Sequence, residues 1–261
     1  MKRIGRPGEA TTDRETVSVV IPVKDDGVEL ARCLAALEAQ TRRPDEIVVV
    51  DNGSSDSSAA VAAAAGARLT RCEEPGIPAA ASHGYDRATG DLILRLDADC
   101  VPDDTWVRDV VEAFRAHPEV AAFTGGARFI DGPRLLRVPL AAVYLAAYAA
   151  AAGPALGHLT LFGSNVALRR DAWIEVRSTV HRHDPEIHDD FDLAFHLGER
   201  HRIRYLRGAP MGMSMRPFAS GPAFLRRFRR GVRTVAVHWP HDFPPSRWRR
   251  LALRDRQVPS P

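Results

Sequence analysis

The sequence predicts an α/β fold in which a mostly parallel central sheet is flanked by helices, and three observations support this prediction. Short apolar runs rich in β-branched or aliphatic residues lie at 17–21, 47–50 and 92–96, and each stops at a Pro or an Asp. Between them, apolar residues recur three or four positions apart, which is the spacing of an amphipathic helix. Strands that alternate with helices in this way are typical of one parallel sheet covered on both faces.

Each element is predicted from its own local pattern, in chain order. Strands are expected at 17–21, 47–50, 68–72, 92–96, 120–123, 127–130, 165–168 and 203–206. Helices are expected at 30–37, over an alanine-rich stretch ending near residue 66, and at 78–88, 106–114, 138–157 and 191–199. The clearest helical face combines Trp106, Val110 and Phe114. The alternation weakens after about residue 125, and no linker is long enough to separate two domains.

The composition excludes several classes of protein. With 261 residues, 45% hydrophobic and 26% charged, the chain can bury a substantial core and is ordinary for a soluble globular protein. Its formal net charge of +3 is too small to favour nucleic acid as a partner. The three cysteines are odd in number and widely spaced, so they predict neither disulfides nor a Cys-x-x-Cys metal site. They favour a reducing compartment, and we expect a cytoplasmic protein.

The two ends and one alanine-rich stretch need separate interpretation. Residues 1–15 are expected to form a flexible tail without a secretory signal, and residues 241–261 a basic tail. A single domain is expected over residues 16–240. The uncharged stretch 138–157 comes nearest to a membrane span, but it is mostly alanine and is interrupted by proline and glycine. A buried or interfacial helix is the favoured interpretation.

Two carboxylates follow one of the predicted apolar strands. The run at 92–96 ends in Asp97 and Asp99, which would share one face of an extended strand about 7 Å apart. Ligands of open α/β sheets bind outside the carboxyl ends of the strands, and acids there can hold a divalent cation against a diphosphate. An Asp-x-Asp triplet occurs again at 190–192, so the motif depends on its context.

Five segments, taken in order, resemble those of the family 2 glycosyltransferases, and the match runs from residue 17 to about 231. They are Val-Ser-Val-Val-Ile-Pro at 17–22, Ile-Val-Val-Val-Asp-Asn-Gly-Ser-Ser-Asp at 47–56, Gly-Asp-Leu-Ile-Leu-Arg-Leu-Asp-Ala-Asp at 90–99, Gly-Ser-Asn-Val-Ala-Leu-Arg-Arg at 163–170 and Asp-Asp-Phe-Asp-Leu at 189–193. The resemblance implies a glycosyltransferase A-type fold. In it, a Rossmann-like nucleotide-binding half, 16–125, is fused to an irregular acceptor-binding half, 126–240.

The same resemblance implies the reaction and the residues that bind the donor. The family transfers a sugar from a nucleotide diphosphate sugar to an acceptor hydroxyl, usually with inversion and with a Mg or Mn ion. Asp51 would hydrogen-bond the nucleobase beside the backbone of Pro22 and Val23. Asp97 would contact the ribose or the donor sugar, and Asp99 would hold the metal ion on the diphosphate.

The acceptor side of the site is expected around Asp190. This residue matches the family's general base, which removes the proton of the attacking hydroxyl. The flanking Asp189 would raise the pKa of one member of the pair. Asp192 is expected to cap or orient the following helix.

Simpler interpretations stay open for each of these positions. Asp51 could be a turn residue, Asp190 a helix N-cap, and Asp97 with Asp99 a solvated loop. Three histidines resemble a metal cluster by eye but are interpreted as solvated loop residues: His181, His183 and His188.

The chain departs from the family pattern at three places. Ala81 and Ser82 stand where an Arg-Asn pair is frequent, and Met213 to Met215 where a late His often reaches the metal or diphosphate. Arg229 and Arg230 lie near a position that can contact phosphate, but no Trp follows Arg230. These departures leave open a non-catalytic nucleotide-sugar-binding or scaffold protein. A nucleotidyltransferase is disfavoured because no glycine-rich loop follows the first strand.

The last third of the chain is rich in arginine. Between residues 224 and 239 apolar side chains are interleaved with arginines at near-helical spacing, as in a basic amphipathic helix. A solvated face, a clamp on the diphosphate and a surface for anionic lipid would all explain this pattern. The resemblance leaves the acceptor open, because many family members use lipid-linked or membrane-bound acceptors and others use polysaccharide. On the basis of the lipid-linked and membrane-bound acceptors, we predict weak, salt-sensitive association with the inner face of a membrane.

Overall fold

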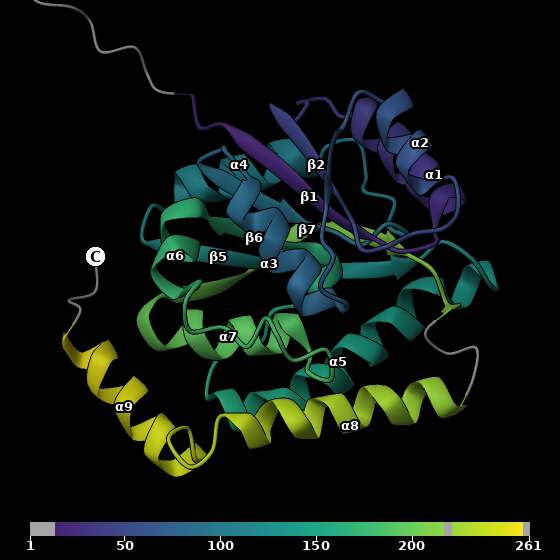
Figure 1. Ribbon diagram of the computed structural model, residues 1–261. Helices are drawn as coiled ribbons and strands as arrows, with labels where there is room; N and C mark the ends of the chain where they lie inside the picture. The colour runs from purple at the N-terminus through teal and green to yellow at the C-terminus, as the bar shows by residue number, and fades with distance from the viewer. Residues whose placement is uncertain (1–13, 217–220, 258–261) are drawn as a thin grey trace, which may run out of the picture.

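A computed structural model describes residues 14–216 and 221–257 and is organised around one seven-stranded sheet (Figure 1). The strands lie in the order β3-β2-β1-β4-β6-β5-β7. Their bounds are β1 Val17–Val23, β2 Glu46–Asp51, β3 Arg68–Arg71, β4 Leu92–Arg95, β5 Val120–Phe129, β6 Val166–Arg169 and β7 Arg202–Met213. Only β6 runs antiparallel to its neighbours among these strands, so the predicted mostly parallel sheet is confirmed.

Helices cover both faces of the sheet (Figure 1). Their bounds are α1 Gly27–Glu38, α2 Ser58–Ala64, α3 Ile77–Arg87, α4 Trp106–Ala116, α5 Arg137–Leu156, α6 Arg170–Val176, α7 Asp189–Arg200, α8 Gly221–Val237 and α9 Pro244–Gln257, with short 3₁₀ turns at η1 Arg134–Leu136 and η2 Gly163–Asn165. Side chains of β1 alternate between two buried clusters: Val19 and Ile21 pack with α1 and α4, and Val20 packs with α3. The alternation gives the sheet an apolar surface on each face.

The carboxyl ends of the parallel strands meet at one edge of the sheet. Pro22 and Val23 at the end of β1 pair with Val50 and Asp51 at the end of β2. The strand β4 lies on the other side of β1 and ends at Arg95, just before the two acids. The predicted donor residues are therefore brought to one edge, as the order of the strands requires.

Two predicted details of the sheet are wrong. The segments 120–123 and 127–130 are one continuous strand, β5, with a register irregularity between Gly125 and Ala127. A side chain at Gly125 would overlap the amide of Asn165, so the glycine allows the close approach. The second detail is the extended geometry of Asp97 and Asp99: β4 stops at Arg95, and the N–H of Cys100 bonds the carbonyl of Asp97 in a turn.

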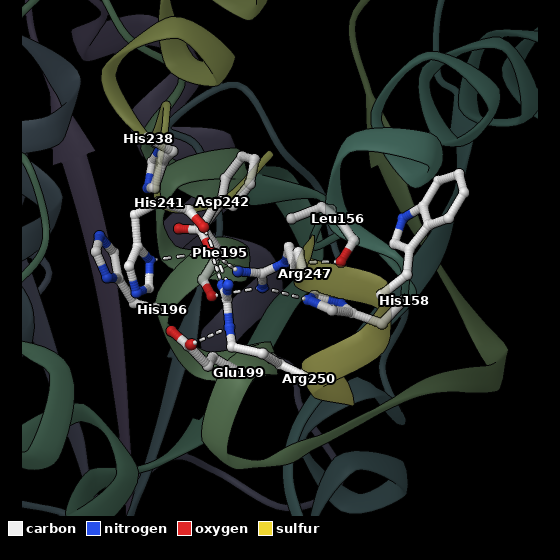
Figure 2. Close-up of polar contacts among 12 residues, drawn as sticks. Leu156, His158, Phe195, His196, Glu199, His238, His241, Asp242, Arg247 and Arg250 are labelled. Atoms are coloured by element: carbon white, nitrogen blue, oxygen red, sulfur yellow. Dashed lines mark hydrogen bonds and ion pairs between the residues drawn. The ribbon is translucent and has the colours of Figure 1, made fainter. Parts of the chain in front are cut away.

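The C-terminal segment is not a tail over residues 244–257, because it forms α9 and is anchored by a buried arginine (Figure 2). Arg247 is fully buried, and its guanidinium donates to the carbonyls of Leu156 and Phe195 at 2.7 Å each. It also pairs with Asp242 at 2.9 Å. The sequence did not reveal this role because α9 is rich in arginine throughout. Of the predicted N-terminal tail, residues 1–13 lie outside the described part of the chain.

The alanine-rich stretch forms α5, and only part of it is buried. With η1 it makes one continuous helical segment, 134–156, which is long and apolar enough to cross a membrane by length and composition alone. Leu135, Val138 and Val143 are each more than 60% exposed, whereas Ala152 and Leu156 are buried. In the N-terminal half Ala141 alone is buried, so the interpretation as a buried helix holds mainly for the C-terminal end.

Candidate active site

The proposed base, Asp190, lies in the first turn of α7. The backbone N–H of Gly163 donates to its Oδ2 at 2.8 Å, and the hydroxyl of Tyr148 donates to its Oδ1 at 3.2 Å. The positive end of the helix dipole also favours a carboxylate here. His188, not Asp190, occupies the N-cap position of α7. The helix-cap interpretation of Asp190 is therefore wrong, and its carboxylate is held by two other elements of the fold.

The neighbouring Asp189 is partly buried and faces an arginine that the sequence analysis did not single out. Arg95 at the end of β4 is 3% exposed and pairs with Asp97 at 2.8 Å and with Asp189 at 3.5 Å. Burial works against its charge, yet the Asp189 and Asp97 carboxylates raise the pKa of Arg95. Burial raises the pKa of Asp189, Arg95 opposes the increase, and Asp190 adds to it. The flanking carboxyl group therefore titrates at higher pH than an ordinary aspartate, as the sequence predicted for one member of the pair.

Two consecutive residues of η2 connect the donor side of the site to the acceptor side. Gly163 bonds Asp190, and the hydroxyl of Ser164 donates to Asp97 Oδ2 at 2.6 Å. The next residue, Asn165, is buried and accepts a hydrogen bond from the indole of Trp106, which fixes η2 in the core. The candidate base and the candidate sugar-binding carboxylate are thus positioned by one rigid turn.

Replacing Gly163 with Ala should destabilise the protein by about 1–3 kcal/mol, the usual range for overpacking a core. The added Cβ would overlap Nη1 of Arg95 and come within 3.2 Å of Asp190 Oδ2. Urea unfolding measures the change. Gly153→Ala in α5 is the matched control, because its Cβ meets no atom within 4 Å and should leave stability unchanged or raised. Equal stability of both variants would show that η2 can move freely.

Asp99 has the features expected of a cation ligand. One ligand atom each of Asp97, Asp99 and Cys100 lie within 4.8 Å of one another. Burial, and then the charge of Asp97, raise the pKa of Asp99, so its ionised form needs a nearby positive charge. Burial also raises the pKa of the Cys100 thiol, which leaves the two carboxylates as the oxygen ligands that Mg²⁺ or Mn²⁺ prefers.

Arg216 supplies the positive charge in this structure. Its Nη2 lies 2.9 Å from Asp99 Oδ2, and its guanidinium forms a two-pronged pair with Asp26 at 2.6 and 3.0 Å. It directly follows the Met-Ser-Met segment that stands where the family often has a histidine. A metal ion on Asp99 would have to share or replace this contact.

The nucleobase end of the site contains Asp51, Pro22 and Val23. Asp51 is 8% exposed, and its Oδ1 accepts the backbone N–H of Ser54 at 2.8 Å. The N–H of Asn52 bonds the carbonyl of Val23 at 2.9 Å. The contacts of Asp51 are therefore those of a turn residue. This role does not conflict with a second role in binding the nucleobase.

The predicted arginines of α8 do not join this group. Arg230 pairs with Glu186 at 3.5 Å, and Arg229 is exposed. Arg227 is closer to the site: it donates to the hydroxyl of Tyr144 at 3.2 Å, and the pKa of Tyr144 is raised by burial and also by the charge of Asp190. Arg227 is thus linked to the site through Tyr144.

Comparison with known proteins supports the resemblance to the family 2 glycosyltransferases. The profile of glycosyl transferase family 2 matches residues 18–176, which include β2 to β6, all but the first residue of β1, and the donor carboxylates. The chain belongs to glycosyl transferase family 2. The glycosyltransferase A-type fold implied by the sequence is likewise confirmed by solved structures.

Two solved structures show how far the family 2 fold extends along the chain. A mannosyltransferase from Pyrobaculum calidifontis, in complex with GDP-Man and Mn²⁺, has a TM-score of 0.65 at 18% identity and covers 96% of this chain and 77% of its own. Glucosyl-3-phosphoglycerate synthase from Mycobacterium tuberculosis, in complex with phosphoglyceric acid, has a TM-score of 0.62 at 19% identity and covers 89% and 85%. At these identities the likeness establishes the fold alone.

The curated relatives match a shorter region. Glycosyltransferase AglE of Haloferax volcanii is 33% identical over 99 residues, which are 35% of this chain and 33% of that protein. Another relative is matched over 26% of its length. The chain thus aligns with no more than a third of either relative.

Two of the three loop histidines, His181 and His188, are not the solvated residues that the sequence suggested, whereas the side chain of His183 is 76% exposed, as expected of a solvated residue. His181 bonds Asp192, His183 bonds Glu74, and the Nε2 of His188 bonds the carbonyl of Arg227. Asp192 is 2% exposed and accepts from His181 rather than capping α7, so its predicted capping role is also wrong.

Three residues of the site were not predicted from the sequence. Arg95 could have been suspected, because a charge inside an apolar strand needs partners. Tyr148 lies four residues after Tyr144 in an alanine-rich helix, a spacing that places two hydroxyls on one face. For Arg216 no local signal existed, since its partners are distant in the chain.

Proposed function

We propose that this chain transfers a sugar from a nucleotide diphosphate sugar to an acceptor hydroxyl by a single displacement with inversion. One observation supports this most strongly: Gly163 and Ser164 tie the carboxylate of Asp190 to that of Asp97. A base and a donor-binding carboxylate on one rigid turn suit a reaction in which the acceptor attacks a bound sugar.

In the proposed reaction, the nucleobase lies against Asp51 and the backbone of Pro22 and Val23. Asp97 orients the ribose or sugar, and Asp99, with Asp97 nearby, would hold a Mg or Mn ion. When bound, that ion supplies positive charge where the leaving nucleoside diphosphate becomes more negative. The family match and the Mn²⁺ in the complex of the mannosyltransferase support a divalent cation.

Asp190 would accept the proton of the acceptor hydroxyl as the new bond forms. The acceptor oxygen bonds the anomeric carbon while the bond from that carbon to the diphosphate oxygen breaks, and the hydroxyl proton passes to the carboxylate. Tyr148 and the N–H of Gly163 hold the carboxylate in place. Arg95 compensates the negative charge of Asp189 and Asp97, which would otherwise repel the carboxylate of Asp190.

A screen of nucleotide sugars tests this proposal directly. UDP- and GDP-sugars with and without Mn²⁺ are the first candidates. At a hundred times its dissociation constant a ligand stabilises by about 2.7 kcal/mol, or roughly 5–10 °C in the unfolding midpoint of a chain of this size. Stabilisation without transfer or slow hydrolysis of the donor would favour the non-catalytic binding protein. Absence of any Mn²⁺-dependent stabilisation across the screen would contradict both.

We further propose that the outer surface of α5 and α8 contacts an anionic membrane, which would place the protein at the inner face of the membrane. Leu225, Phe228 and Val232 of α8 are each more than half exposed and share one face of the helix. Figure 1 shows α8 beside α5, whose apolar N-terminal half is also exposed, and Arg227 bonds Tyr144 across them. Apolar side chains flanked by arginine suit a lipid headgroup region.

Co-sedimentation with anionic and neutral vesicles should show binding to the anionic ones that weakens with salt. Each basic residue adds about 1 kcal/mol near such a surface, so Arg226→Gln/Arg229→Gln should lower partitioning by roughly thirtyfold. Both arginines are exposed. Ile174→Gln on α6, an exposed apolar residue elsewhere, is the control and should bind as wild type. Equal, negligible pelleting with both vesicle types would contradict membrane association.

A further inference from the structure

Four side chains from three separate segments converge beside α7. Asp192 and His196 lie one turn apart on α7, His181 lies in the segment before it, and His238 directly follows α8. One ligand atom from each of the four residues lies within 4.8 Å of all the others. This group is separate from the donor carboxylates and plays no part in the proposed reaction.

Two of the distances to Asp192 match those between the ligand atoms of a tetrahedral metal site. Nε2 of His238 and Nε2 of His196 lie 3.4 and 3.6 Å from Asp192 Oδ1. Around a tetrahedral zinc ion with bonds of about 2.0–2.1 Å, the ligand atoms are about 3.4 Å apart. The remaining contact, His181 Nδ1 to Asp192 Oδ1, is a hydrogen bond of 2.7 Å, and metal binding would replace it and lengthen the distance to about 3.4 Å.

The hydrogen bonding of His238 leaves a lone pair on its Nε2 that is directed at the carboxylate of Asp192. Its Nδ1 lies 2.7 Å from the carbonyl of Thr234, which can only accept, so Nδ1 carries a proton. In the neutral ring Nε2 is then an acceptor, yet it faces Asp192, another acceptor. Nε2 of His196 is also buried without a hydrogen-bond partner. Such an arrangement is satisfied by a cation between the groups.

The ring of His238 is also held in the orientation that a ligand requires. It stacks on Phe195 with 3.9 Å between ring centroids, and its side chain is 2% exposed. A backbone carbonyl on the far nitrogen is a usual outer partner of a metal-bound histidine, because it fixes the tautomer and the ring. The side chain of Asp192 is 3% exposed and that of His181 is 37% exposed, so the group is closed to solvent except on the side of His181.

We propose that His181, Asp192, His196 and His238 bind a zinc ion that fastens α8 and the segment before α7 to α7 itself. Three imidazole nitrogens and one carboxylate in a closed, four-coordinate arrangement favour zinc over Mg²⁺ or Mn²⁺, which prefer six oxygen ligands. With all four positions filled by protein, the ion is structural. Asp190 lies two residues before Asp192, so the zinc also steadies the helix that carries the proposed base.

The test is the metal content of the full chain, purified without a histidine tag and measured by mass spectrometry. We expect about one zinc per chain, and a loss of affinity of more than about a hundredfold in His196→Gln and in His238→Gln. His241→Gln is the matched control: His241 is exposed and belongs to the neighbouring group with Glu199 and Asp242. It should retain the zinc.

A second measurement uses only the wild-type chain, because the ligand variants could fold poorly. Chelation should lower the midpoint of thermal unfolding, and Zn²⁺ alone, but not Mg²⁺ or Mn²⁺, should restore it. Substitution with Co²⁺ should give the strong visible absorption of tetrahedral coordination. Zinc-free protein that neither binds added Zn²⁺ nor changes its midpoint would overturn the proposal and leave a protonated His238 paired with Asp192. Zinc content lost in His241→Gln instead would also overturn it.

Discussion

Replacing Asp190 with Asn should lower turnover by roughly 10²–10⁴-fold, the usual contribution of a general base. The amide keeps the shape of the side chain, and its oxygen can still accept the N–H of Gly163, so the fold should be unchanged. What is lost is the ability to take a proton from the acceptor. Donor affinity, measured by calorimetry with the nucleoside diphosphate and Mn²⁺, should stay within a few-fold of wild type.

Asp171→Asn provides the matched control for this substitution. Asp171 is an exposed aspartate in the first turn of α6, so it shares with Asp190 any effect on the helix dipole. Its replacement should leave turnover unchanged. If Asp190→Asn retained turnover within a few-fold while transfer was measurable, Asp190 would be a structural residue and the base would have to be found elsewhere.

The second large effect is expected at Asp99. Asp99→Ala should reduce metal-dependent binding of the nucleoside diphosphate by at least about a hundredfold, because the substitution removes the main oxygen ligand of the proposed ion. Folding should suffer little. The raised pKa of Asp99 means that its ionised form destabilises the folded state near neutral pH, and Arg216 keeps its pair with Asp26 in the variant.

Calorimetry with and without Mn²⁺ measures this effect, and thermal unfolding checks that the variant is folded. The midpoint should remain within about 4 °C of wild type. Asp104→Ala, an exposed aspartate five residues further on, should bind donor and metal as wild type does. An unchanged affinity in Asp99→Ala with Mn²⁺ present would rule out Asp99 as the principal ligand.

The regular first half of the fold was predictable because its signals are local. A buried strand such as β1 or β2 is a run of β-branched residues, and α4 repeats its apolar residues at helical spacing whatever it packs against. The irregular second half was predicted less well. The strand β7 extends over Arg202–Met213, where only 203–206 was predicted, since its exposed arginines and glycines interrupt the strand pattern.

The positions of the candidate site carboxylates were also local properties. Asp51 ends β2, and Asp97 and Asp99 closely follow β4, so a parallel sheet brings them to one edge without further information. The protonation of these carboxylates and their pairing with other residues could not be predicted from local sequence. Arg95 looked like an interruption of an apolar strand until its partners Asp97 and Asp189 were seen together.

The sequence alone determined that this is a mostly parallel α/β protein of the family 2 type, and which carboxylates follow its strands. The tertiary structure decided which groups meet. Arg216 reaches Asp26 from 190 positions away, Gly163 holds Asp190 from 27 positions away, and the histidine cluster draws on three segments. Periodicity records only which residues share a face of one element. Contacts between elements depend on how the elements pack, and that packing is set by the whole core.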